Sequence, residues 1–195
     1  SDDRDKLIQT ANEISQAPLF VDDSPSRTVS EIAAAARRIK RREESLGLIV
    51  IDYLQLIEPD NSRDPRQEQV AKIARRLKGL ARELEVPLLC LSQLNRQAED
   101  SKDHRPKLSH LRESGAIEQD ADVVMFVHRE EYYHRGDDKA QFAGQAEIII
   151  SKQRNGPIGD VELTWEADFT RFSDRAAERH SEFDDYAEFT SPGGF

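Results

Sequence analysis

The sequence predicts an α/β fold: a mainly parallel sheet flanked by helices, with an antiparallel hairpin near the C-terminal end. Helix-length segments with one apolar face alternate along the chain with short strands that are apolar throughout. Strands of that kind are typical of parallel sheets whose two faces are both covered. The hairpin is indicated by two apolar runs on either side of Asn155-Gly156-Pro157.

Two helices and a short strand are expected first. Residues 3–16 predict a short helix, and "PLFVDD" at 18–23 predicts a strand that runs into a loop. Thr28 and Glu31 then have the spacing of a capping box, in which each side chain binds the other residue's backbone N–H. Apolar residues follow at helical intervals, and we expect this helix to end near Gly47.

The central segments alternate between buried strands and one long helix. Residues 48–52 are apolar up to Asp52, so we expect neither face of this strand to contact water. Residues 66–85 carry one apolar stripe at helical spacing and predict the second long helix. Two further apolar runs predict strands, and two polar stretches predict loops: strands at 86–92 and 122–128, loops at 95–108 and 129–143.

The C-terminal part divides into a hairpin and a tail. "AEIIISKQRNGPIGDVELTW", residues 146–165, predicts two strands around a turn. Residues 173–195 are acidic and show no pattern that would form a core, so they predict a solvated, disordered tail. Residues 1–172 are therefore predicted to form one domain.

Composition limits the classes of function. No apolar run approaches the roughly 18 residues that cross a bilayer, and the acidic start "SDDRDK" shows no secretory signal, so we expect a cytoplasmic protein without a membrane partner. Cys90 is the single cysteine and predicts a buried thiol without an internal disulfide. The net charge of −10 disfavours nucleic-acid binding by the whole surface but permits a local basic channel.

Polar residues follow two neighbouring strands of the predicted sheet. Asp52 ends the first strand, and Ser92 and Gln93 end the second. Ligands of open α/β sheets lie beyond the carboxyl ends of the strands, so these residues predict a site for a metal ion and a phosphate. The spacing is equally compatible with Asp52 capping a turn and Gln93 lying in an ordinary loop.

Two cations precede the hairpin turn. Lys152 and Arg154 are two residues apart, so on a strand they point to the same side. Two cations that point in the same direction favour binding of a phosphate, which Arg can bind with two parallel hydrogen bonds. The alternative is a solvated hairpin end with two exposed charges.

A third cluster lies in "LRESGAIEQDAD", residues 111–122. Arg112, Glu113 and Ser114 combine charge and polarity next to Gly115, which lets a backbone come close to a ligand. Such a loop suits a nucleic-acid backbone. The alternative is the start of an ordinary helix interrupted by a glycine.

Four segments, in order and nearly without gaps, closely resemble the C-terminal motor domain of DnaB-type replicative DNA helicases. They are "LIVIDYLQLI", "LARELEVPLLCLSQLNR", "RPKLSHLRESGAIEQDADVVMFVHREEYY" and "AEIIISKQRNGPIGDVELTW". The similarity runs from about residue 18 to Phe172. It implies a RecA-like core, a ring-shaped homohexamer, and ATP hydrolysis at each subunit interface that drives movement along single-stranded DNA and duplex unwinding.

The resemblance also implies roles for individual residues. Asp52 resembles the Walker B acid that organises Mg²⁺, here expected to act through water, and Gln93 resembles the glutamine that senses the phosphate. Lys152 and Arg154 match hairpin cations that reach the nucleotide of the neighbouring subunit, with Arg154 as the arginine finger. The loop that follows the DNA backbone matches at three positions: Arg112, Glu113 and Gly115. ATP and Mg²⁺ are the implied cofactors, and primase and a helicase loader are implied partners of the full-length protein.

The sequence departs from this family in one respect. It contains no G-x-x-x-x-G-K-[ST] phosphate loop, which in the family lies upstream of the matched region together with the catalytic glutamate. We therefore expect a C-terminal portion of a helicase that is inactive by itself, with activity belonging to the full-length protein. Two alternatives stay open: an interaction module without a phosphate loop, and another ring-forming ATPase of the RecA family.

Overall fold

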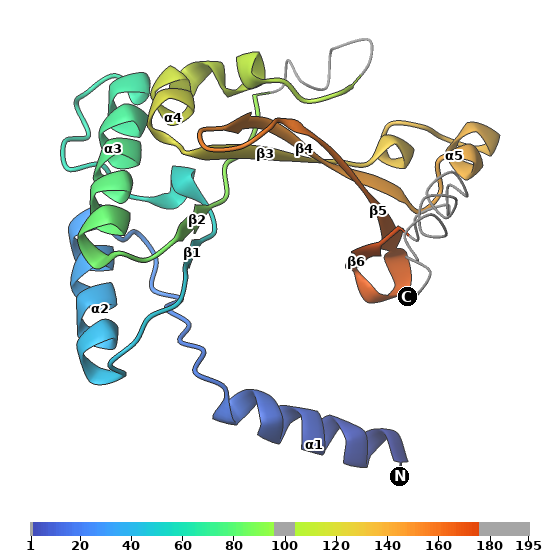
Figure 1. The fold of residues 1–195 in the computed structure, drawn as a ribbon, viewed down its shortest axis with the longest axis horizontal. Helices are drawn as coiled ribbons and strands as arrows, with labels where there is room; N and C mark the ends of the chain where they lie inside the picture. Colours follow the sequence, from blue (N-terminus) through green and yellow to red (C-terminus); the bar gives the residue numbers. More distant parts are fainter. Residues whose placement is uncertain (1, 96–103, 176–195) are drawn as a thin grey trace, which may run out of the picture.

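The computed structural model describes residues 2–95 and 104–175. Its first helix, α1 (Asp2–Gln16), projects away from the rest of the chain (Figure 1). The segment after α1 has no regular structure, so the expected strand at 18–23 is wrong. Leu19 and Val21 are largely exposed there. An apolar run becomes a strand only when a neighbouring strand pairs with it, and here none does among the described residues.

The second helix, α2 (Val29–Arg42), begins as the sequence predicts. The backbone N–H of Glu31 donates to Thr28 Oγ1 over 3.3 Å, and the backbone N–H of Thr28 donates to Glu31 Oε2 over 2.9 Å, which confirms the capping box. The helix ends about a turn earlier than expected. The chain leaves it through Glu44, whose φ is 59°, before Gly47 is reached.

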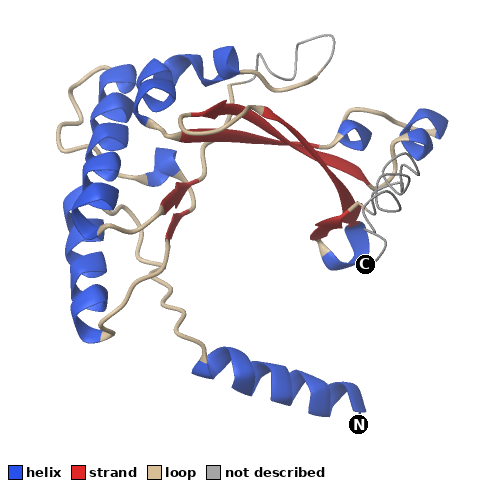
Figure 2. Ribbon diagram, in the orientation of Figure 1, coloured by secondary structure: helices blue, strands red, loops and turns tan. Residues whose placement is uncertain are grey.

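The long helix α3 (Arg66–Leu84) confirms the predicted apolar stripe and packs against α2. Its stripe forms the middle of the core, beside the short 3₁₀ turn η1 (Leu54–Leu56). Figure 2 shows both helices on the same side of two short strands. The buried residues of the stripe are Val70, Ile73, Leu77, Leu80 and Leu84.

The strands β1 (Ile49–Ile51) and β2 (Leu88–Cys90) pair in parallel, with Ile49 opposite Leu88. Ile49, Ile51, Leu88 and Cys90 pack toward the helices. Val50 and Leu89 point the other way and are 56% and 40% exposed. The expectation that neither face of this strand contacts water is therefore wrong for the chain by itself.

Four strands form an antiparallel sheet in the order β3-β4-β5-β6. The predicted α/β class and C-terminal hairpin are thereby confirmed. Residues 122–128 join this sheet and not the parallel one, so the parallel sheet in the described ranges consists of β1 and β2. The last strand was not predicted and includes Ser173. The strands are β3 (Val123–His128), β4 (Gln145–Gln153), β5 (Gly159–Glu166) and β6 (Arg171–Asp174).

Short helical turns join these elements. The expected loop at 129–143 contains two of them, and the region of the expected loop at 95–108 is described only from residue 104 onward. Most of the predicted acidic tail, residues 176–195, lies outside the described residues. No described helix has the length and apolar character to span a membrane. The turns are η3 (Leu108–Ser114), α4 (Gly115–Asp120), η4 (Glu130–Tyr132), α5 (Asp137–Gln141) and η5 (Ala167–Phe169).

Candidate functional site

Asp52 lies directly after β1, at the carboxyl end of the parallel sheet. Its side chain is exposed, and the peptide bond to Tyr53 is cis. Within the part of the chain that the structure describes, no hydrogen bond or ion pair engages the Asp52 carboxylate. The acid is therefore available to a ligand from solution, and it does not lie in an internal ion pair.

Gln55 links the segments that follow the two strands. Its Nε2 donates to Ser92 Oγ over 3.1 Å and to the Gln93 carbonyl over 3.3 Å, and its Oε1 accepts from the Gln93 backbone N–H over 3.3 Å. The side-chain amide of Gln93 stays exposed. Asp52 and Gln93 thus lie at the same edge, with Gln55 fixing the backbone that carries Gln93. No feature of the sequence had pointed to Gln55.

The donor set at this edge fits Mg²⁺ held together with a polyphosphate. Mg²⁺ keeps several waters and is bound by one or two carboxylates plus phosphate oxygens. Asp52 supplies one free carboxylate, and the Ser92 hydroxyl and the Gln93 amide supply neutral oxygens nearby. The described residues hold no cluster of three His, Cys, Asp or Glu side chains that could bind a metal ion unaided. The chemistry therefore matches a site that a bound polyphosphate would help to complete.

The Lys152 side chain reaches the C-terminal end of α4. Its Nζ donates to the Glu118 carbonyl and, over 3.3 Å, to the Gln119 carbonyl. A cation at this position interacts favourably with carbonyl groups left unpaired at a helix end. Lys152 is half-buried, and its Nζ binds backbone carbonyls, whereas its sequence position predicted that it points with Arg154 toward a phosphate.

Arg154 is the first residue of the β4–β5 turn, and its side chain is 52% exposed. Its Nη1 lies 3.2 Å from Asp122 Oδ1. The hydrogen bond from Lys78 is the main cause that holds the pKa of the Asp122 carboxyl below its usual value, and the charges of Lys78, Arg154 and Lys152 act in the same direction. Asp122 ends the segment 111–122 singled out above, but its contacts with Lys78 and Arg154 were not expected, because they join residues far apart along the chain.

The predicted DNA-contacting residues lie where η3 meets α4. Arg112 and Glu113 belong to η3, and the exposed Gly115 begins α4. The segment is tied to the edge that carries Gln93, because the Asn95 backbone N–H donates to the His110 carbonyl over 3.2 Å. This geometry is compatible with both alternatives. The segment can be the start of an ordinary helix interrupted by a glycine, or it can be a loop that contacts a ligand.

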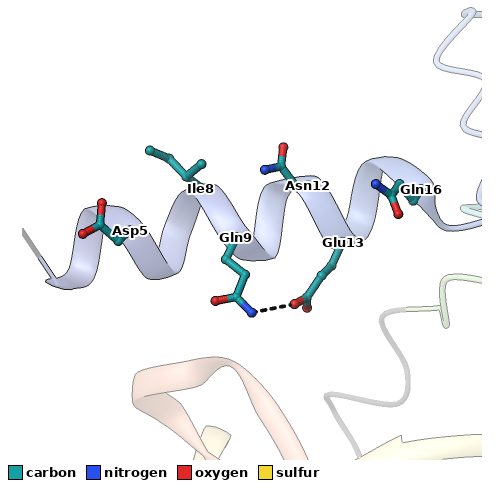
Figure 3. Close-up of a pocket in the computed structure, with 6 residues that line it drawn as sticks. All are labelled: Asp5, Ile8, Gln9, Asn12, Glu13 and Gln16. Carbon is teal, nitrogen blue, oxygen red and sulfur yellow. Dashed lines mark hydrogen bonds between the residues drawn. The ribbon is translucent and has the colours of Figure 1, made fainter.

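A separate hollow lies along α1 and contains none of the predicted residues. Side chains of a single helix line it, including Ile8, Asn12 and Glu13, and Gln9 Nε2 donates to Glu13 Oε1 over 3.0 Å (Figure 3). A ligand pocket needs walls from more than one element to bury its occupant. This hollow is therefore not the candidate site.

Comparison with known proteins places this chain in a family. The family model described as "DnaB-like helicase C terminal domain" matches residues 1–174. The chain belongs to this family. The replicative DNA helicase DnaB of Geobacillus stearothermophilus is 48% identical over 172 residues, which is 88% of this chain and 37% of the relative. The DnaB of Pasteurella multocida is 50% identical over 168 residues, which is 86% of this chain and 35% of the relative.

Solved structures share the fold. One of them, described as an ATPase domain, superposes with a TM-score of 0.84 at 40% identity, and the match covers 90% of this chain and 61% of that one. A DnaB-like replicative helicase, solved in a study of its interactions with primase, gives a TM-score of 0.84 at 40% identity, and the match covers 90% of this chain and 41% of the other. The chain spans about a third of the length of the curated relatives.

Proposed function

We propose that this chain is part of a hexameric replicative DNA helicase that couples ATP hydrolysis between subunits to movement along single-stranded DNA and duplex unwinding. Asp52 helps to hold Mg²⁺, and Gln93 contacts the terminal phosphate or the attacking water. Arg154 acts on the nucleotide of the next subunit, and Lys152 joins it there when its Nζ leaves the carbonyls at the end of α4. Bound Mg²⁺ would neutralise phosphate charge.

One observation carries the proposal. In a chain of the DnaB-like family, the Asp52 carboxylate lies exposed and unpaired among the described residues, at the edge where Gln55 fixes the backbone of Gln93. A free carboxylate at the carboxyl end of a parallel sheet lies where ligands of open α/β sheets bind and can ligate a divalent ion there. Arg154 supports a site between two copies, because its half-exposed side chain makes no hydrogen bond or ion pair with Asp52 or Gln93 in the described structure.

The experiment uses the complete protein and compares Asp52→Asn with the wild type in Mg²⁺-dependent ATP hydrolysis. We expect a loss of kcat of about 10²-fold or more, since loss of the metal's carboxylate removes charge stabilisation from the transition state. The matched control is Asp60→Asn, which alters an exposed acid paired with Arg76 away from this edge. Equal activity of Asp52→Asn and the wild type would reject the role of Asp52.

Arg154 is tested by Arg154→Ala in the same protein. An arginine finger contributes roughly 10³–10⁵-fold in rate, so hydrolysis should be almost abolished while nucleotide binding stays near normal. Equal loss of binding and hydrolysis would instead assign Arg154 to the pocket of its own subunit.

We also propose that the segment around Arg112, Glu113 and Gly115 follows the backbone of single-stranded DNA. Arg112→Ala in the complete protein should weaken binding of oligonucleotides of different sequence to a similar extent. Because the contact is to phosphate, the slope of log affinity against log salt concentration should fall by about 0.7, the value for one contact to a single strand. Unchanged affinity and slope would reject this role.

The 195-residue chain by itself is expected to bind ATP weakly and to release no phosphate from it, because it contains no Gly-rich Lys-Thr or Lys-Ser loop. Primase, a loader and a cytoplasmic location belong to the same proposal for the complete protein. An interaction module without activity is the second candidate. It would be favoured if the complete protein also lacked a phosphate loop.

A further inference from the structure

A carboxylate lies directly against the proposed arginine finger. Asp122 connects α4 to β3, and 49% of its side chain is exposed. Its Oδ1 lies 3.2 Å from Arg154 Nη1, and its Oδ2 accepts a hydrogen bond from Lys78 Nζ on α3. The two cations therefore occupy different oxygens of one carboxylate, so that either contact can be removed without removing the other.

The backbone of Arg154 is attached to the same residue. Its N–H donates to the Asp122 carbonyl over 2.8 Å, just beyond the last β3–β4 pair, Val123 with Gln153. The main chain and the side chain of Arg154 are thus both held by Asp122. These two contacts fix the position of the Arg154 backbone and the direction of its side chain at the end of the sheet.

The guanidinium of Arg154 keeps free donors beside Asp122. Lys78 on α3 binds the second oxygen of the carboxylate, so two cations share its single negative charge. Asp122 therefore orients Arg154 without fully cancelling the charge of its guanidinium. A guanidinium has five N–H donors in a planar fork, so contact with a carboxylate along one edge leaves other donors for a phosphate.

We propose that Asp122 is a positioning residue for hydrolysis, which holds Arg154 in an outward conformation ready for the nucleotide of the adjacent subunit. This inference rests on the proposed function of Arg154. Without Asp122, the long arginine side chain samples many rotamers, and fewer of them reach the phosphate. Arg154 stabilises charge that develops in the transition state, so its position affects the rate of hydrolysis more than the binding of ATP. Loss of Asp122 should therefore lower kcat and change KM little.

The experiment measures steady-state ATP hydrolysis by the complete protein with saturating single-stranded DNA. Asp122→Asn keeps the size of the side chain and removes its charge. We expect kcat to fall about 3- to 10-fold while KM for ATP stays within about twofold of the wild type. Asp122→Glu restores a carboxylate and should recover at least half of the lost rate.

Lys78→Met is the matched control, because it removes the other partner of the same carboxylate and leaves the Arg154 contact in place. Its kcat should stay within about twofold of the wild type. The inference is overturned if Asp122→Asn leaves kcat unchanged or raises it, or if Lys78→Met lowers kcat as much as Asp122→Asn does. Equal loss in both variants would mean that the Asp122 carboxylate stabilises the packing of α3 and does not position Arg154.

Failure of the proposed function gives a different result. If Arg154→Ala retains the wild-type kcat, Arg154 does not serve hydrolysis, and the inference falls together with that role. If Arg154→Ala abolishes hydrolysis and Asp122→Asn has no effect, only the positioning role is rejected. Thermal unfolding of each variant shows whether a lower kcat reflects a smaller folded fraction.

Discussion

The guanidinium of Arg129 lies over the indole ring of Trp165, with 4.2 Å between its central carbon and the ring centroid. This contact joins the residue after β3 to β5 at the end of the antiparallel sheet that is distant from α3 (Figure 1). Glu131 binds the same guanidinium and also accepts a hydrogen bond from the Gly144 backbone N–H over 3.0 Å. One arginine thus connects an aromatic ring, a buried carboxylate and the start of β4.

Glu131→Gln should lower the free energy of unfolding of the chain by about 1–3 kcal/mol at pH 7, because Glu131 is buried and its loss of charge leaves Arg129 without its acid. The hydrogen bond from Arg129 is the main cause that lowers the pKa of Glu131. A carboxyl whose pKa is lower in the folded state stabilises the fold above its unfolded pKa, and this contribution is lost as the pH falls through the folded pKa.

Urea unfolding at several pH values from 7 downward tests this prediction. The difference between Glu131→Gln and the wild type should be largest at neutral pH and should shrink below the ordinary glutamate pKa of 4.5. Glu162→Gln is the control, since that exposed side chain pairs only with Arg175 at the surface, over 3.2 Å, among the described residues. A constant difference at all pH values would contradict the assignment to the ionised carboxylate.

Thr28→Ala should destabilise α2 by removing the hydroxyl that accepts the Glu31 backbone N–H. Loss of such an N-cap costs about 0.5–2 kcal/mol. Thr28→Ser keeps the hydroxyl and should behave nearly like the wild type in thermal or urea unfolding. If alanine and serine at this position gave the same stability, the hydroxyl would not be the stabilising group.

Gln55→Leu should impair hydrolysis by the complete protein more than it impairs folding, because the amide of Gln55 holds the backbone of Gln93. We expect kcat to fall about 3- to 10-fold, as for other losses of positioning. Gln67→Leu removes an exposed amide from α3 and serves as the control in the same ATPase assay. Parallel losses in both variants would point to a general effect of the substitution.

Cys90 should react slowly with thiol reagents in the folded chain. Burial raises the pKa of its thiol to about 11 from 9.0. The thiolate fraction at a given pH below 9 should therefore be about a hundredfold smaller than in the unfolded chain. Labelling at pH 8 with and without urea measures the ratio. Equal labelling rates would show that the thiol is exposed in the native state.

The elements that the sequence predicted correctly are those whose pattern is local. The capping box of Thr28 and the stripe on 66–85 depend only on nearby residues. The apolar run 122–128 shows that β3 is a strand, but its antiparallel pairing with β4 depends on a segment some twenty residues away. The run at 18–23 failed for a related reason, since a strand needs a neighbour that the run itself does not specify.

In the candidate site too, residues with a local sequence pattern were predicted and residues defined by long-range contacts were not. Asp52 and Gln93 were expected at one edge because both follow apolar strands, and the structure places them there. Gln55 was missed because an amide in a 3₁₀ turn has no sequence signature. Asp122 was missed because its contacts with Lys78 and Arg154 join residues more than thirty positions away along the chain.

The apolar side chains on the open face of β1 and β2 have a practical consequence for handling the chain alone. Val50 and Leu89 lie side by side in the paired register, and both meet solvent. Association through such a surface strengthens on warming from the cold, since apolar contacts weaken at low temperature. Preparations of this chain are thus best kept cold and dilute, and cloudiness that appears on warming and clears on chilling would indicate association through exposed apolar side chains such as these.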